Sequence, residues 1–338
     1  MKNKYFTYCA GALAIVLIGC TSGQDELLDS IPVENRIAIS AGIGGPSVTT
    51  RVVNDYSYTT PSNEHPLDAV VWFTDDTSSP TQFANSGTST SLPRYSYVNF
   101  TSGEMTFPTS DVLPYTAGKA THAVGFWPKT GWTATDSNTK AQHTINGTDD
   151  LMFANKVTAE ADYKFTTLEQ LHFNHKLTWL KVRVTASSDE AITAWGKITS
   201  IKVASEKTLT VTLNDGSETY SGFVDVAAGD PNTNAISLYD DATGVSLTTS
   251  AIELGSAFCA PTATATYKLI VKSKNETSGK IVTVNLKTLN NEAIASTIDA
   301  TKGKEFIITL TFQPFQMIDA VGKSLTDWTN ENIQITGS

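Results

Sequence analysis

The five histidines and several aspartate pairs are the side chains of this 338-residue chain best suited to metal binding or acid–base chemistry. His172 and His175 are three positions apart, a spacing that suits two metal ligands on a helix. The residues that surround them predict a β-strand, on which positions three apart point to opposite faces. We therefore expect that the two imidazoles do not share a metal ion.

Aspartate doublets at 75–76, 149–150 and 240–241 lie among Thr, Ser or Gly residues. Such surroundings predict turns, in which a short carboxylate accepts hydrogen bonds from nearby backbone amides. The sequence has no calcium-loop spacing, serine-hydrolase elbow, phosphate loop or zinc-protease motif. We therefore expect no enzyme activity, metal or cofactor. The alternative is a hydrolase that uses two carboxylates brought together by the fold.

The N-terminal residues predict export and a lipid anchor. Lys2 and Lys4 precede a short apolar run, which is typical of a secretory signal peptide. The Leu-Ile-Gly-Cys stretch that ends at Cys20 resembles the bacterial lipobox, whose cysteine is lipidated. The sequence therefore predicts a lipoprotein signal over 1–19, lipidation of Cys20 and a flexible tether over 20–35.

Charge and cysteine content fit an extracellular chain. The formal net charge is −10, and it becomes −12 when the signal peptide with its two lysines is removed. An acidic surface argues against nucleic acid as a partner. Cys259 is the only cysteine beyond Cys20, so no intrachain disulfide is expected, and its small apolar neighbours predict a buried thiol.

The rest of the chain is rich in Thr, Ser, Val, Ile and Gly, a composition that favours strands and turns. Alternating apolar residues predict strands over 177–184, 208–213, 267–271, 281–286 and 306–312. Asn214-Asp215-Gly216 predicts a hairpin turn. The sequence thus predicts an all-β protein of two tandem antiparallel β-sandwich domains, 36–169 and 170–338. Residues 159–171 are interpreted as the connection between the domains.

The tryptophans have two interpretations. They either pack in the cores, which we favour, or they line a surface that stacks carbohydrate rings. The residues concerned are Trp127, Trp132, Trp179, Trp195 and Trp328, with Tyr95 and Tyr97.

Several segments, in order, resemble one bacterial family. They are the lipobox at Cys20, residues 37–43 followed by Thr50-Arg51, residues 150–154, residues 171–182, and a C-terminal strand followed by Asp327-Trp328-Thr329. Together they resemble the fimbrillin, or Mfa-like, proteins of Bacteroidetes, which build or anchor type V pili. The sequence departs from the family pattern at Thr178-Trp179.

This resemblance implies a transthyretin-like, Greek-key type of sandwich and a structural role in a surface pilus. A trypsin-like protease is expected to cut after Arg51, which releases the first strand. Ile37, Ile39 and Ala41 are the expected groove-filling residues of that strand, whose place a neighbouring pilin subunit then takes by donor-strand exchange. The implied location is the outer membrane for the lipid-anchored precursor and the pilus after processing.

Two alternatives stay open at this stage. One is that the chain is a surface lipoprotein that never polymerises and that binds carbohydrate or a host ligand. The tail from Gln313 to Ser338 either supplies the incoming strand or completes the second sandwich.

Overall fold

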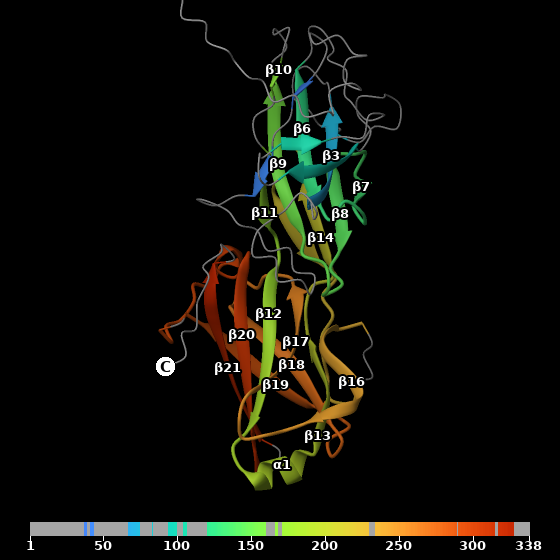
Figure 1. Ribbon diagram of the computed structural model, residues 1–338. Coiled ribbons are helices and arrows are strands. Elements are labelled where there is room, and N and C mark those ends of the chain that lie inside the picture. The colour runs from blue at the N-terminus through green and yellow to red at the C-terminus, as the bar shows by residue number, and fades with distance from the viewer. Residues whose placement is uncertain are drawn as a thin grey trace, which may run out of the picture.

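The computed structural model confirms an all-β protein. It describes residues 37–38, 41–43, 67–74, 83, 94–99, 104–106, 120–159, 166–167, 171–229, 234–288, 290–314 and 317–327. Its strands form an elongated molecule with two tiers, and helix α1 (Asp189–Trp195) closes the far end of the lower tier (Figure 1). No helix in these ranges is long and apolar enough to cross a membrane.

The upper tier contains a seven-stranded sheet. Its strands, in spatial order, are β2 (Ala41–Ile43), β11 (Leu171–His175), β9 (Met152–Ala159), β6 (Thr121–Trp127), β3 (Leu67–Thr74), β4 (Arg94–Asn99) and β5 (Glu104–Thr106). All neighbours are antiparallel except β2 and β11, which run parallel. A separate short parallel pair joins β1 (Ile37–Ala38) to β10 (Thr166–Thr167).

A four-stranded sheet packs against this larger sheet. Its order is β15 (Glu218–Ser221), β14 (Thr208–Thr212), β8 (Lys140–Thr144) and β7 (Thr133–Thr135). The two sheets share a core in which the Phe126 ring contacts those of Trp72, Trp132 and Phe153, with centroids 4.6, 4.7 and 5.2 Å away. Such tilted aromatic contacts stabilise a core beyond the area they bury.

The lower tier is an eight-stranded set. Its order is β16 (Ile236–Ser246), β13 (Lys197–Val203), β18 (Thr266–Ser273), β19 (Lys280–Lys287), β21 (Met317–Asp327), β20 (Lys304–Gln313), β12 (Thr178–Ala186) and β17 (Ile252–Cys259). β19 and β21 meet over only two residue pairs, and buried residues from both sides of this join share one core. The set is therefore two four-stranded layers joined at one edge.

The strands predicted from alternation are present as β12, β14, β18, β19 and β20. On β12 the predicted inward set, Leu180, Val182 and Val184, is fully buried. The predicted turn joins β14 to β15, and Gly216 there has φ +72°, a conformation that favours glycine. β12 and β20 are parallel over eight residue pairs, which the expected antiparallel pattern did not include.

Two segments differ from their predicted roles, and a third takes one of the two roles that the sequence left open for it. Asp240 and Asp241 lie within β16 and not in a turn, although Asp241 Oδ1 does accept the expected hydrogen bond from a nearby backbone amide, that of Thr243, at 2.8 Å. Residues 159–171 connect β9 to β11, two neighbouring strands of one sheet, and the chain passes to the lower tier only after His175. The tail from Met317 to Asp327 pairs along β20, so this part completes the lower sandwich.

Strand pairing also crosses the predicted boundary near residue 170. Hairpin β14–β15 belongs to the range 170–338, yet β14 pairs with β8 of the range 36–169. The division into two domains stays a prediction.

The tryptophans that the structure describes pack inside. Trp72, Trp127, Trp179 and Trp195 are buried, and Trp132 packs against the core while half-buried. The side chains of Tyr95 and Tyr97 lie outside the described part, as does Trp328.

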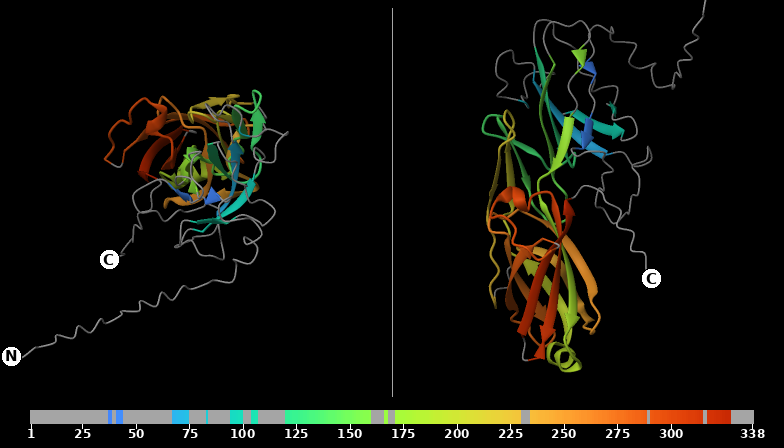
Figure 2. Two further views of the ribbon diagram at one scale, coloured as in Figure 1. Left: turned by 90° about the horizontal axis from the view of Figure 1, so that it is seen from above. Right: turned by 90° about the vertical axis from the view of Figure 1, so that its left-hand side faces the viewer.

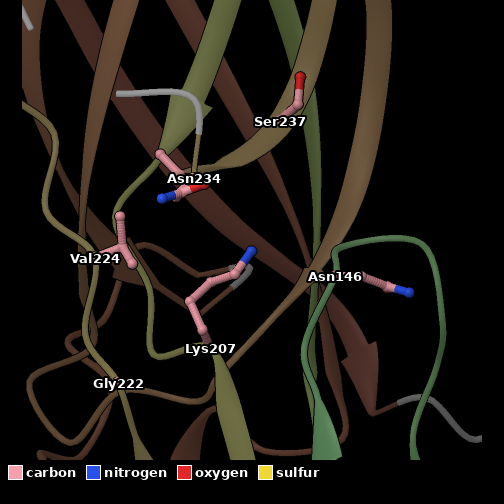
Figure 3. Close-up of a pocket in the computed structure, with 7 residues that line it drawn as sticks. Asn146, Lys207, Gly222, Val224, Asn234 and Ser237 are labelled. Carbon is pink, nitrogen blue, oxygen red and sulfur yellow. The ribbon is translucent and has the colours of Figure 1, made fainter. Parts of the chain in front are cut away.

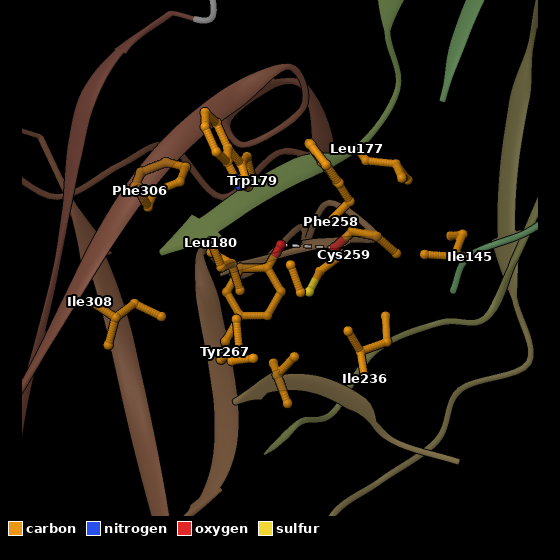
Figure 4. Close-up of a cluster of buried hydrophobic side chains, with 14 of the residues drawn as sticks. Ile145, Leu177, Trp179, Leu180, Ile236, Phe258, Cys259, Tyr267, Phe306 and Ile308 are labelled. Atoms are coloured by element: carbon orange, nitrogen blue, oxygen red, sulfur yellow. Dashed lines mark hydrogen bonds between the residues drawn. The ribbon is translucent and has the colours of Figure 1, made fainter. Parts of the chain in front are cut away.

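A continuous core passes between the tiers. Ile145 and Leu177, from the upper tier and its connection, lie beside Ile236 and Phe258 of the lower tier (Figure 4). Cys259 is fully buried in the same cluster, as the sequence predicted, and burial raises the pKa of its thiol. Tyr267 donates a hydrogen bond of 2.8 Å to the Ala260 carbonyl within this core.

Candidate strand-exchange edge

β2 is one of the two edge strands of the seven-stranded sheet, and β5 is the other. It lies parallel to β11 through three pairs, in which Ala41, Gly42 and Ile43 face Leu171, His172 and Phe173. The opposite side of β11 pairs with β9 in the antiparallel sense. Because β2 is an edge strand, its removal would leave one side of β11 with unpaired backbone groups. Such an edge accepts an added strand.

β11 is anchored by alternating side chains. Leu171 and Phe173 are fully buried, whereas His172 and Asn174 are exposed. The Phe173 ring packs directly over Gly125 of β6: a Cβ placed at Gly125 would lie 2.6 Å from Phe173 Cζ. Glycine in this strand therefore makes room for the aromatic ring that fixes β11 on the sheet.

The end of β11 is held by a histidine–aspartate pair. His175 Nδ1 lies 2.7 Å from Asp150 Oδ2, and the Asp150 side chain is inaccessible to solvent. Asp150 was expected in a turn with its neighbour Asp149, whose amide does bond to Asn146 in a local turn. Nothing in the sequence signalled that Asp150 turns inward toward a residue 25 positions away.

The two histidines of β11 differ in their surroundings, as expected for positions three apart on a strand. His172 is exposed, and His175 is half-buried against Asp150. Within the described ranges, no group of three or more His, Cys, Asp or Glu side chains could hold a metal ion.

A buried ionic cluster follows β11 directly. Lys176 Nζ lies 2.7 Å from Glu218 Oε1, and Lys302 Nζ lies 3.2 Å from Glu218 Oε2. The Tyr220 hydroxyl lies 2.6 Å from the Lys176 carbonyl oxygen and 3.0 Å from Glu218 Oε2. These contacts join the residue after β11 to hairpin β14–β15 and to the turn before β20.

Burial and charge act in opposite directions in this cluster. Burial by itself would raise the pKa of the Glu218 carboxyl, but the ammonium groups of Lys176 and Lys302 outweigh it and hold the pKa below its usual value. Burial lowers the pKa of Lys176, and Glu218 opposes this only in part. The cluster therefore stabilises the charged form of Glu218, whereas burial disfavours the charged form of Lys176.

A polar cavity of about 540 Å³ lies at the junction of the tiers. Its lining consists of Asn146, Lys207, Gly222, Val224, Asn234, Ala235 and Ser237. In Figure 3 the Lys207 side chain extends into the space between Val224, Asn234 and Asn146, whereas the amide of Asn146 points away. The sequence contained no signal for this cavity, because its walls come from four separate segments.

The predicted site residues are only partly placed. Ile37 lies in β1, where it faces Thr166 in a parallel pair, and Ala41 lies in β2. Cys20, Arg51 and Ile39 lie outside the described residues. Figure 2 shows the short first strands beside the strands of the upper tier.

No protein-family model matches the sequence, and no curated protein matches it significantly. Solved structures do resemble it. A candidate cell adhesion protein from Bacteroides uniformis is 17% identical, with a TM-score of 0.51 over 88% of this chain and 100% of that one. A candidate cell adhesion protein from Bacteroides ovatus is 16% identical, with a TM-score of 0.49 over 88% and 99%. The first similarity shows a shared fold.

Proposed function

We propose that this chain is an adhesion-type surface protein of the fimbrillin class, exported as a lipoprotein and assembled into a pilus by strand exchange. The fold is shared with a protein described as a candidate cell adhesion protein, which supports the adhesion role. The lipobox at Cys20 supports delivery to the outer membrane by a lipid anchor. The role needs no catalytic residue or cofactor.

The position of β2 carries the proposal. β2 is short, it lies at a sheet edge, and it pairs only with β11 within the described ranges. In the sequence it is followed by residues 44–66, a Gly-, Pro- and Thr-containing stretch that includes Arg51. A protease cut after Arg51 separates β1 and β2 from the rest of the chain.

Strand exchange then follows from the chemistry of a sheet edge. Loss of β2 leaves backbone N–H and C=O groups of β11 without partners, which favours addition of another strand. A strand from a neighbouring subunit restores these hydrogen bonds, and its alternate side chains replace those of the departed segment. The cut thereby links processing to assembly.

Trypsin treatment of the purified protein tests this role. We expect cleavage after Arg51, a new N-terminus at Val52, and fibres visible by electron microscopy. Arg51→Ala should abolish both. Arg36→Ala is the matched control, because Arg36 precedes β1 and its loss should leave assembly intact. Fibres formed equally by Arg51→Ala, with residues 37–43 still attached, would overturn the proposed exchange.

A second candidate role is a surface lipoprotein that does not polymerise and that binds carbohydrate or a host ligand. The polar cavity beside Lys207 favours this candidate. The two roles are compatible, since a pilus subunit can also carry a ligand site.

A further inference from the structure

The cavity beside Lys207 is formed where the two tiers meet. Asn146 follows β8, Lys207 precedes β14, Val224 follows β15, and Ser237 is the second residue of β16. Ligand sites occur preferentially at such junctions, because separate segments supply the walls of a concave space. The volume of about 540 Å³ is within the range of small-molecule sites.

The Lys207 ammonium is an unmatched charge. Its backbone is fixed by hydrogen bonds to Ser221 and Ile145, but within the described ranges its Nζ has no hydrogen-bond or ion-pair partner. None of the seven lining residues is acidic. Burial lowers the pKa of this lysine, with only the Cys259 thiol acting in the opposite direction. A ligand carboxylate would offset this partial desolvation of the ammonium.

Other lysines near the tier junction differ in this respect. Lys176 is paired with Glu218, and Lys302 contacts both Glu218 and Asp299. Lys207 therefore differs from these two lysines in having no carboxylate partner in the described part of the chain, whose net charge over its full length is −10.

The remaining walls suit a sugar. Asn234 and Ser237 supply an amide and a hydroxyl, and Val224 and Ala235 supply small apolar surface. In Figure 3 the Lys207 ammonium lies below the Asn234 side chain, whose amide nitrogen points toward Val224. Amide and hydroxyl groups form hydrogen bonds with ring hydroxyls, and an ammonium binds a carboxylate.

We infer that the Lys207 cavity binds the carboxylate of an acidic sugar, such as a uronic or sialic acid at the end of a glycan. This inference rests on the proposed adhesion role but does not require strand exchange. Since one ammonium that water can reach gives a modest interaction, a single site binds weakly. Many copies on a fibre or a cell surface would raise the overall avidity.

Calorimetric titration of the Arg51→Ala protein, which is expected to stay monomeric, tests the inference. The probes are N-acetylneuraminic acid, glucuronic acid, glucose and N-acetylglutamate. We expect both acidic sugars to bind at least about tenfold more tightly than glucose, because a charged hydrogen bond is lost with the neutral sugar. N-acetylglutamate should bind more weakly than the acidic sugars, because it lacks the ring hydroxyls.

Lys207→Gln should reduce binding of the acidic sugars by about tenfold or more. Lys287→Gln is the matched control, since it removes the same charge from an exposed strand position and should leave binding unchanged. Ser237→Tyr keeps the ammonium but narrows the cavity, and it should also weaken binding. Thermal unfolding of each variant verifies that it is folded.

Equal binding of glucose and the acidic sugars, or undiminished binding by Lys207→Gln, would overturn the inference. Equal or tighter binding of N-acetylglutamate would also overturn it, in favour of a peptide carboxylate. Failure of fibre assembly would leave this titration unaffected, so the two proposals fail separately.

Discussion

Lys176 Nζ lies 2.7 Å from Glu218 Oε1, and this buried ion pair fixes hairpin β14–β15 to the residue that follows β11. Their side chains are only 6% and 10% exposed. The pair therefore links the end of β11, the strand that pairs with β2, to hairpin β14–β15, which is distant in the sequence. Removal of one partner would leave the other charge buried without compensation.

Glu218→Gln is expected to destabilise the protein by about 3 kcal/mol, because two ammonium groups lose their carboxylate. Chemical denaturation at neutral pH measures this free energy of unfolding. The control is Glu253→Gln, which breaks the exposed pair with Arg183 at 3.4 Å and should change stability by less than about 0.5 kcal/mol. Equal effects of the two substitutions would contradict the role of the buried cluster.

The same carboxyl predicts a pH dependence. The pKa of Glu218 is lower in the folded state than its ordinary value of 4.5, which describes the unfolded state. Its contribution to stability is therefore complete above that value and is lost as the pH falls through the lowered folded-state pKa. Denaturation curves of the parent and Glu218→Gln should converge on acidification below pH 4.5. A difference that stays constant down to the acid transition would refute this expectation.

Gly125→Ala is expected to destabilise the protein by about 2 kcal/mol, because the added Cβ would overlap the Phe173 ring in a closely packed sheet. Phe173→Leu in the same chain should recover part of this loss, since a smaller side chain makes room for the methyl group. A double-mutant cycle from unfolding curves gives the coupling between the two positions. Additive effects would show that the contact with Phe173 is not the cause.

Cys259 should be unreactive in the folded protein. Its thiol is fully buried and its pKa is raised by burial, so the nucleophilic thiolate is scarce even in mildly alkaline solution. In a soluble version that begins at Thr21, a colorimetric disulfide reagent should react with one thiol only after denaturant is added. Rapid labelling of the folded chain at pH 8 would contradict the burial of this residue.

Local alternation made much of the fold predictable from the sequence. β12, β14, β18, β19 and β20 each carry apolar residues at every second position, and Asn214-Asp215-Gly216 encodes a turn with positive φ. These signals concern neighbouring residues only. They identify a strand and the face it buries, but they do not identify the strand with which it pairs.

The unpredicted features are contacts between distant residues. The sequence did not reveal that β14 pairs with β8, that Asp150 turns inward to His175, or that β12 and β20 are parallel. An aspartate beside another aspartate after Gly-Thr has the local signature of a turn whether or not its carboxylate is buried. The cavity at Lys207 was unpredictable for the same reason, because segments distant in the sequence form its walls only in the folded chain.

The central claim is that β2 occupies a replaceable place beside β11. Hydrogen exchange measured by mass spectrometry over residues 171–175 tests it most directly, with β12, which lies between β17 and β20, as the internal control. The account predicts slow exchange in the intact protein, faster exchange after cleavage at Arg51, and slow exchange again in assembled fibres, while β12 does not change. Exchange in β11 that is unaffected by cleavage and by assembly would contradict the account.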